Sequence, residues 1–171
     1  MNSTKYTSES NTQTSQKLSK LLIQETELAK NLVALMLEEK TLLEQNKADD
    51  LSQITNKKTT CLDQIEFVSR NRAQLLLGLS SKPTTAERMK DFISKQVLQA
   101  QTILNNNIDD LEKTLENCRQ QNSINGMIIS MSQRNVQRNL NIIKGIDNNS
   151  MTYTQSGKTT PIGQKTKGLK V

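Results

Sequence analysis

Histidine and tryptophan are absent from this 171-residue sequence, and the only aromatic residues are two phenylalanines and two tyrosines. Without histidine, the commonest general acid–base group is missing, and so are the histidine–carboxylate motifs that hold metals in helical bundles. We therefore expect no enzyme, no metal site and no cofactor. Two prolines and six glycines are too few for a turn-rich β protein. A core here has to be built from Leu, Ile, Val and Met, which suits a narrow helical bundle.

The two cysteines, Cys61 and Cys118, stand alone in the sequence, with no Cys-x-x-Cys pair. This spacing favours neither a zinc site nor a redox motif. Both cysteines fall on helical seams, where a thiol behaves as a small apolar group. We expect two buried, inert thiols.

The formal net charge is +6, which raises the question of nucleic-acid binding. Half of this excess lies in residues 147–171, which contain four lysines and one aspartate. No helical stripe collects the remaining charge, and no basic face carries the aromatic residues on which bases stack. The charge pattern therefore argues against a nucleic-acid-binding protein.

Both ends of the chain are polar. Residues 1–14 consist mostly of Ser, Thr, Asn and Gln, and this composition predicts a disordered N-terminus. Residues 1–15 lack the apolar stretch of a secretory signal, and no run of 18 apolar residues occurs anywhere. The expected location is the cytoplasm. Residues 147–171 return to Ser, Thr, Gly, Gln and Lys, which predicts a flexible tail.

Leucine repeats predict two long helices, at about residues 15–46 and 49–79, in which apolar residues step by three and four. We expect Ser15 to cap the first helix and Asp49 or Asp50 to cap the second. The short connection predicts that the two helices are antiparallel neighbours. The predicted core consists of Leu28, Leu32, Leu35, Ile65, Val68 and Leu111.

Two glutamates, Glu25 and Glu39, occupy seam positions of the first helix. A di-metal site would need histidine partners, which the sequence does not have. We expect these glutamates to meet cations such as Lys58 or Arg72 across the helix pair.

A third helical region covers residues 84–146 and begins at Thr84 or Thr85 with Glu87 in its first turn. At about 1.5 Å per residue it would span roughly 95 Å, about twice the length of either predicted partner helix. It must either break, near residues 94–101, or extend past its partners.

The apolar pattern of this third region changes along its length. From Leu104 to Cys118 the apolar residues form a 3.5-residue seam, typical of a helix packed lengthwise on another helix. Farther on, half of the seam positions are small and polar, whereas a second stripe opens on another face. It consists of Ile124, Met127, Ile128 and Met131. This stripe predicts a surface for another chain. The alternatives are that the helix folds back on it, or that a homodimer forms when that other chain is not bound.

Several segments within about residues 18–157 form a recognisable ordered set. They are 50–58, 65–70 with Arg72, 121–127, Arg134 with Asn135, 140–143 and 152–157. This ordered set resembles the FlgN family of flagellar export chaperones. The resemblance implies an all-α fold, an antiparallel bundle or hairpin of three long helices with a disordered N-terminus and a C-terminal tail. This sequence departs from the family in its longer polar N-terminus and in Thr154 and Gln155.

The resemblance also implies a function. Such chaperones bind the C-terminal helices of the hook-associated, hook–filament junction proteins (the FlgK/FlgL type), prevent their premature assembly and bring them to the type III export apparatus. Their client site lies on the C-terminal helix. The expected client-binding residues are Ile124, Met127, Ile128, Met131, Asn135, Leu140 and Ile143. Tyr153 matches the tail tyrosine implicated in docking on the export gate protein FlhA. The alternative function is a structural coiled-coil or adaptor protein that self-associates.

Overall fold

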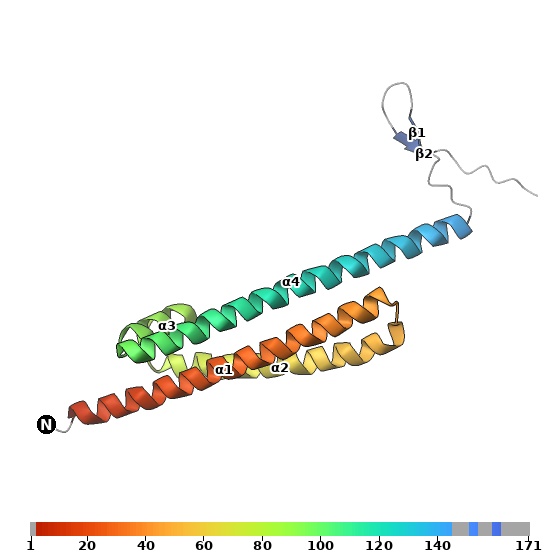
Figure 1. Ribbon diagram of the computed structural model, residues 1–171. Coiled ribbons are helices and arrows are strands. Elements are labelled where there is room, and N and C mark those ends of the chain that lie inside the picture. The colour runs from red at the N-terminus through yellow and green to blue at the C-terminus, as the bar shows by residue number, and fades with distance from the viewer. Residues whose placement is uncertain (1–2, 145–150, 154–158, 162–171) are drawn as a thin grey trace, which may run out of the picture. The chain divides into compact units, whose positions relative to one another are not determined.

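The computed structural model describes residues 3–144, 151–153 and 159–161, with the side chains of residues 11–144. Its elements are α1 (Ser3–Glu44), α2 (Ala48–Leu77), α3 (Thr85–Ser94), α4 (Leu98–Ile143), β1 (Met151–Tyr153) and β2 (Thr159–Pro161) (Figure 1). The chain divides into two compact units, residues 1–128 and 129–171. The all-α class is confirmed, but the described residues form four helices rather than the three expected.

Helix α1 begins at Ser3, so the prediction of a disordered segment over residues 1–14 is wrong for most of that segment. Extending an existing helix adds one backbone hydrogen bond per residue and needs no new nucleus. A polar segment can therefore extend an amphipathic helix at its N-terminus. Ser15 consequently lies inside α1 and caps nothing. It is 8% exposed, and its Oγ donates to Oε1 of Gln96 at 2.9 Å.

Helices α1 and α2 form the expected antiparallel pair, joined by a tight turn. Asn46 adopts φ 54°, a left-handed conformation that asparagine tolerates better than most residues. Helix α2 then starts one residue before Asp49, so neither Asp49 nor Asp50 is its cap. Both lie in the first turn, where their charges favour the positive end of the helix dipole.

The third helical region breaks between Ser94 and Leu98. Helix α3 starts with a capping box, in which the Thr84 hydroxyl and the Glu87 carboxylate each accept from the other's backbone N–H. Its C-terminus turns at Gln96, where the carboxamide Nε2 donates to Phe92 O at 3.1 Å and Gln101 Nε2 donates to Gln96 O at 2.8 Å. These bonds satisfy groups that a continuous helix would pair internally.

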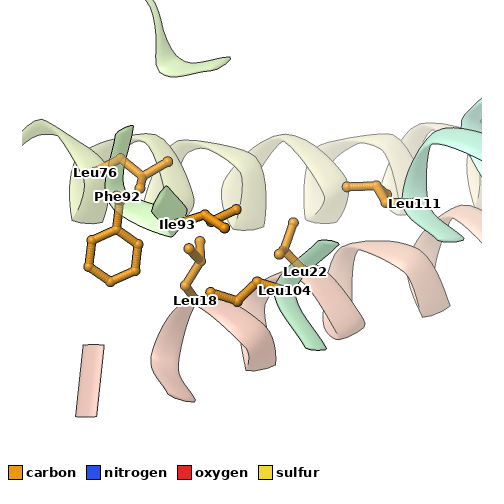
Figure 2. Close-up of a cluster of buried hydrophobic side chains, with 7 residues drawn as sticks. All are labelled: Leu18, Leu22, Leu76, Phe92, Ile93, Leu104 and Leu111. Carbon is orange, nitrogen blue, oxygen red and sulfur yellow. The ribbon is translucent and has the colours of Figure 1, made fainter. Parts of the chain in front are cut away.

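The break allows α3 to pack into the bundle. Phe92 and Ile93 are 4% and 6% exposed. Figure 2 shows them among leucines from α1, α2 and α4. The members of this first core cluster are Leu18, Leu22, Leu76, Phe92, Ile93, Leu104 and Leu111. Fully burying one such side chain contributes about 1.5–3 kcal/mol.

A second cluster lies nearer the turn between α1 and α2 and contains both cysteines. Its buried members are Ala29, Leu32, Met36, Cys61 and Cys118. Of the predicted core, Leu32, Val68 and Leu111 are buried, whereas Leu28, Leu35 and Ile65 are half-buried. Cys61 and Cys118 are buried as expected.

The expected ion pairs across α1 and α2 are confirmed. Arg72 Nε and Nη2 donate to the two carboxylate oxygens of Glu25 at 2.8 and 3.2 Å. Lys58 Nζ donates to both oxygens of Glu39 at 2.8 and 2.7 Å. Since buried charges are costly unless paired, these contacts explain how glutamates occupy seam positions.

The predicted tail contains two short strands, which the sequence reasoning did not expect. Strands β1 and β2 pair antiparallel, with Met151 opposite Pro161 and Tyr153 opposite Thr159. Threonine and tyrosine favour extended backbone, which suits this pairing. The other residues predicted as tail, 147–150, 154–158 and 162–171, lie outside the described residues.

Candidate partner-binding face

Helix α4 has a buried seam with one residue in every seven, Leu104, Leu111, Cys118 and Asn125, and Thr114 is buried beside this seam. The first three pack into the two apolar clusters. The fourth is an asparagine with 2% exposure. The apolar packing of α4 on α1 therefore ends in a polar contact.

Hydrogen bonds hold the buried carboxamide of Asn125 in place. Its Nδ2 donates to Met36 O at 2.8 Å and to Glu39 Oε2 at 2.7 Å. Gln121 Nε2 in turn donates to Asn125 Oδ1 at 2.8 Å. Because Glu39 also holds Lys58, the network joins α1, α2 and α4, and the buried amide is fully satisfied. The sequence shows Asn125 as a polar seam residue, but the partner that satisfies it is visible only in the structure.

Apolar side chains around and beyond Asn125 remain in water. Ile124 and Met127 are 37% and 56% exposed, and Ile128 is half-buried. In the second unit, Met131, Leu140 and Ile143 are 59%, 40% and 80% exposed. Asn135 is also exposed. The residues expected to bind a client are thus largely accessible within the described part of the chain.

These seven residues do not form one stripe. At about 100° per residue, five of them, Ile124, Met127, Ile128, Met131 and Asn135, share one face of a helix. Leu140 and Ile143 instead lie on the face of Asn125, the face that also includes Ile129 and Val136.

Sequence reasoning missed one member of the first face, Ile142, which follows Asn135 by seven residues and is 69% exposed. The heptad step would have found it. It also left Ile129 and Val136 out of the binding set, although they are 39% and 58% exposed. Two apolar faces are therefore available on α4, and we call the first, Ile124, Met127, Ile128, Met131, Asn135 and Ile142, the methionine stripe.

The polar groups of the described residues offer little chemistry. No group of three or more acidic or cysteine side chains in residues 11–144 could hold a metal ion. Burial raises the pKa of the Cys61 and Cys118 thiols, and this disfavours the reactive thiolate. Among residues 3–144, no helix combines the length and apolar character that a membrane crossing requires.

Tyr153, the expected docking residue, is the last residue of β1. The structure describes the backbone of this strand but not its side chains. It pairs Tyr153 with Thr159, and the docking role of Tyr153 stays a prediction.

A helical bundle with an accessible apolar face on its last helix is a fold suited to binding another protein. The sequence matches the FlgN family, described as FlgN protein, over residues 14–161. The crystal structure of a flagella synthesis protein FlgN from Pseudomonas aeruginosa is similar, with 26% identity and a TM-score of 0.55. The match covers 72% of this chain and 94% of that one. No curated protein matches the sequence.

The match spans most of the chain, so the chain belongs to the FlgN family. It is accordingly a flagellar-assembly protein, and an assignment to chaperones and to type III secretion fits this family.

Proposed function

We propose that this protein is a cytoplasmic export chaperone that binds the C-terminal helices of hook–filament junction proteins through α4. The observation that carries the proposal is the methionine stripe, whose apolar side chains stay accessible just where the buried seam ends at Asn125. An amphipathic client helix that lies along α4 would remove these side chains from water. Such helix-to-helix recognition uses apolar anchors spaced by three and four residues.

The residue types on the stripe suit a chaperone with related clients. Met127 and Met131 have unbranched, polarizable side chains that repack around different partners. Promiscuous binding surfaces use such adaptable residues. Asn135 supplies a polar contact within the same face. Binding prevents premature assembly because the client helix is covered until export.

Delivery to the export gate is assigned to Tyr153. A tyrosine contributes a large apolar area and a hydroxyl with few rotamers to immobilise, which makes it an effective anchor in a partner's pocket. The proposed partner is the cytoplasmic part of the gate protein FlhA. Holding and delivery would then use separate segments of the chain.

The competing function is a structural coiled-coil or adaptor protein whose partner is itself. Exposed apolar residues on α4 would serve that function equally well by burying one another. Mass measurement with a junction protein present separates the two functions. A chaperone takes up one client per copy, whereas a structural protein forms a stable homo-oligomer that takes up none.

The client-binding test replaces Met127 with Glu and Ile128 with Lys in one variant. This change should abolish binding to a junction protein's C-terminal helix in calorimetry, while circular dichroism stays unchanged. The matched control is Leu62→Glu with Leu77→Lys, two exposed apolar residues of α2 at 49% and 60%. Wild-type affinity in the first variant would place the site elsewhere.

The delivery test is Tyr153→Ala. We expect unchanged client affinity, weaker capture on immobilised gate protein and lower export of junction proteins. Tyr153→Phe keeps the ring and should retain most of the capture. A joint loss of client binding and thermal stability in Tyr153→Ala would instead make Tyr153 a part of the fold.

A further inference from the structure

Helix α1 has a second apolar face that the bundle covers only in part. Leu21, Leu28 and Leu35 recur every seven residues and are all half-buried, and Leu35 packs against the second core cluster. Contacts with α4 come from a different side of α1, at Ser19, Ala29 and Met36. At 3.6 residues per turn, the two sides lie about a third of a turn apart. Helix α4 therefore leaves the leucine face partly accessible.

Two hollows lie along the line where this face meets α2, and we call this line the groove. The first, of about 480 Å³, lies between Leu21 on α1 and Leu75 on α2. The second, of about 450 Å³, lies between Leu28 and Phe67. Phe67 is 65% exposed. A large aromatic side chain in water beside a leucine row is a typical anchor for a partner.

Basic and acidic side chains lie toward opposite ends of the groove. Lys17 and Lys20 border the first hollow, at the end where α1 enters the bundle. Asp63 borders the second hollow. Since Arg72 faces Glu25 and Lys58 faces Glu39 in the antiparallel pair, Asp63 lies near the level of Leu35.

Glu38 extends this acidic end, three residues beyond Leu35 on the same side of α1. None of Lys17, Lys20, Glu38 and Asp63 is in an ion pair within residues 11–144. Along the helix axis, Lys17, Lys20 and Glu38 lie about 12–17 Å from Leu28, and Asp63, at the level of Leu35, lies about 10 Å from it on the acidic side.

We propose that the groove between α1 and α2 is a self-association surface, on which two copies pair antiparallel about Leu28. A two-fold interface requires one patch that complements itself when it is reversed. Here the leucine row maps onto itself, and Lys17 and Lys20 of one copy meet Glu38 and Asp63 of the other. The pairing completes a four-helix arrangement from two hairpins and leaves the methionine stripe free, so it is independent of client binding.

The test uses charge reversal in the full chain. One variant carries Lys17→Glu and Lys20→Glu, and the other carries Glu38→Lys and Asp63→Lys. Each variant alone places like charges against each other at both ends, so its dimer dissociation constant in sedimentation equilibrium should rise by about tenfold or more. In a 1:1 mixture all the contacts become attractive again, and a heterodimer of near wild-type affinity should form.

A charge-matched control is Lys90→Glu with Lys113→Glu, which changes the net charge equally on the exposed faces of α3 and α4. It should self-associate like wild type. For the apolar part, Phe67→Glu should remove the dimer, whereas Leu62→Glu, an exposed residue outside the groove, should not.

Three results would overturn the proposal. A wild-type chain that is monomeric at every concentration excludes a second copy as the occupant. Single reversal variants that dimerise normally exclude this face. Loss of the dimer in the variant of Met127 and Ile128 would move self-association to α4. Circular dichroism checks that each variant is folded, and Phe67→Glu remains a test if a charge-reversal variant is not.

Discussion

The ion pair between Glu25 and Arg72 should decide a large part of the stability of the α1–α2 hairpin. The side chains of Glu25 and Arg72 are 4% and 13% exposed, and the guanidinium spans both carboxylate oxygens. Arg72 also donates to Ser69 Oγ at 3.3 Å. Both charges are therefore held away from water and depend on each other.

Replacing Arg72 with Met leaves the Glu25 carboxylate buried without its cation. Breaking a buried pair in this way costs about 3–5 kcal/mol. Replacing both residues, with Glu25→Leu and Arg72→Met, removes two desolvation penalties along with the attraction between the charges. The double variant should then lie near wild-type stability or above it. The two single changes are strongly non-additive in this account.

Urea unfolding followed by circular dichroism measures all four members of this cycle. The control is Arg70→Met, which breaks the ion pair between Arg70 and Glu66. The side chains of Arg70 and Glu66 are 74% and 60% exposed. That change should cost no more than about 0.5 kcal/mol. A loss below about 1 kcal/mol for Arg72→Met, or a double variant as unstable as the single ones, would refute the reasoning.

Two further predictions concern the second core cluster. Leu32→Ala should lower the free energy of unfolding by about 2–5 kcal/mol in urea, because Leu32 is buried against both neighbouring helices, and a loss below about 0.5 kcal/mol would contradict its packing. The thiols of Cys61 and Cys118 should react with a disulfide reagent only after unfolding, since burial raises the pKa of each. Their contribution to stability is present below about pH 8.5, where the unfolded thiol is still protonated, and is lost as the pH rises through the folded pKa. Fast labelling of the native protein at neutral pH would contradict this burial.

Periodicity in the sequence determined the helical class and where the first two helices end, and the short connection between them predicted their antiparallel pairing. Three- and four-residue spacing of leucines has only one economical explanation, an apolar face on a helix. The same spacing predicted buried thiols and cation partners for Glu25 and Glu39. It also located the methionine stripe, because seam and stripe differ in phase along one helix.

The start of α1 could not be read from composition. Residues 1–14 look disordered because they carry almost no apolar side chains. Composition describes whether a segment can fold alone, whereas α1 extends from a helix that is already nucleated. The two short strands were missed for a related reason, since three-residue pairings leave almost no periodic signal.

Tertiary structure decided which surfaces are closed and which are open. Only the packing of α4 shows that Asn125 is satisfied by Met36 O and Glu39, and only the placement of the α3–α4 connection shows that Ser15 reaches Gln96 instead of capping a helix. Likewise, Leu28 and Leu32 both lie on the three-four leucine repeat of the sequence, yet Leu28 is half-buried and Leu32 lies in the core. A repeat in the sequence specifies that a face is apolar, but it does not specify a partner. Burial depends on which helix reaches that face, and this is a property of contacts between residues far apart in the chain.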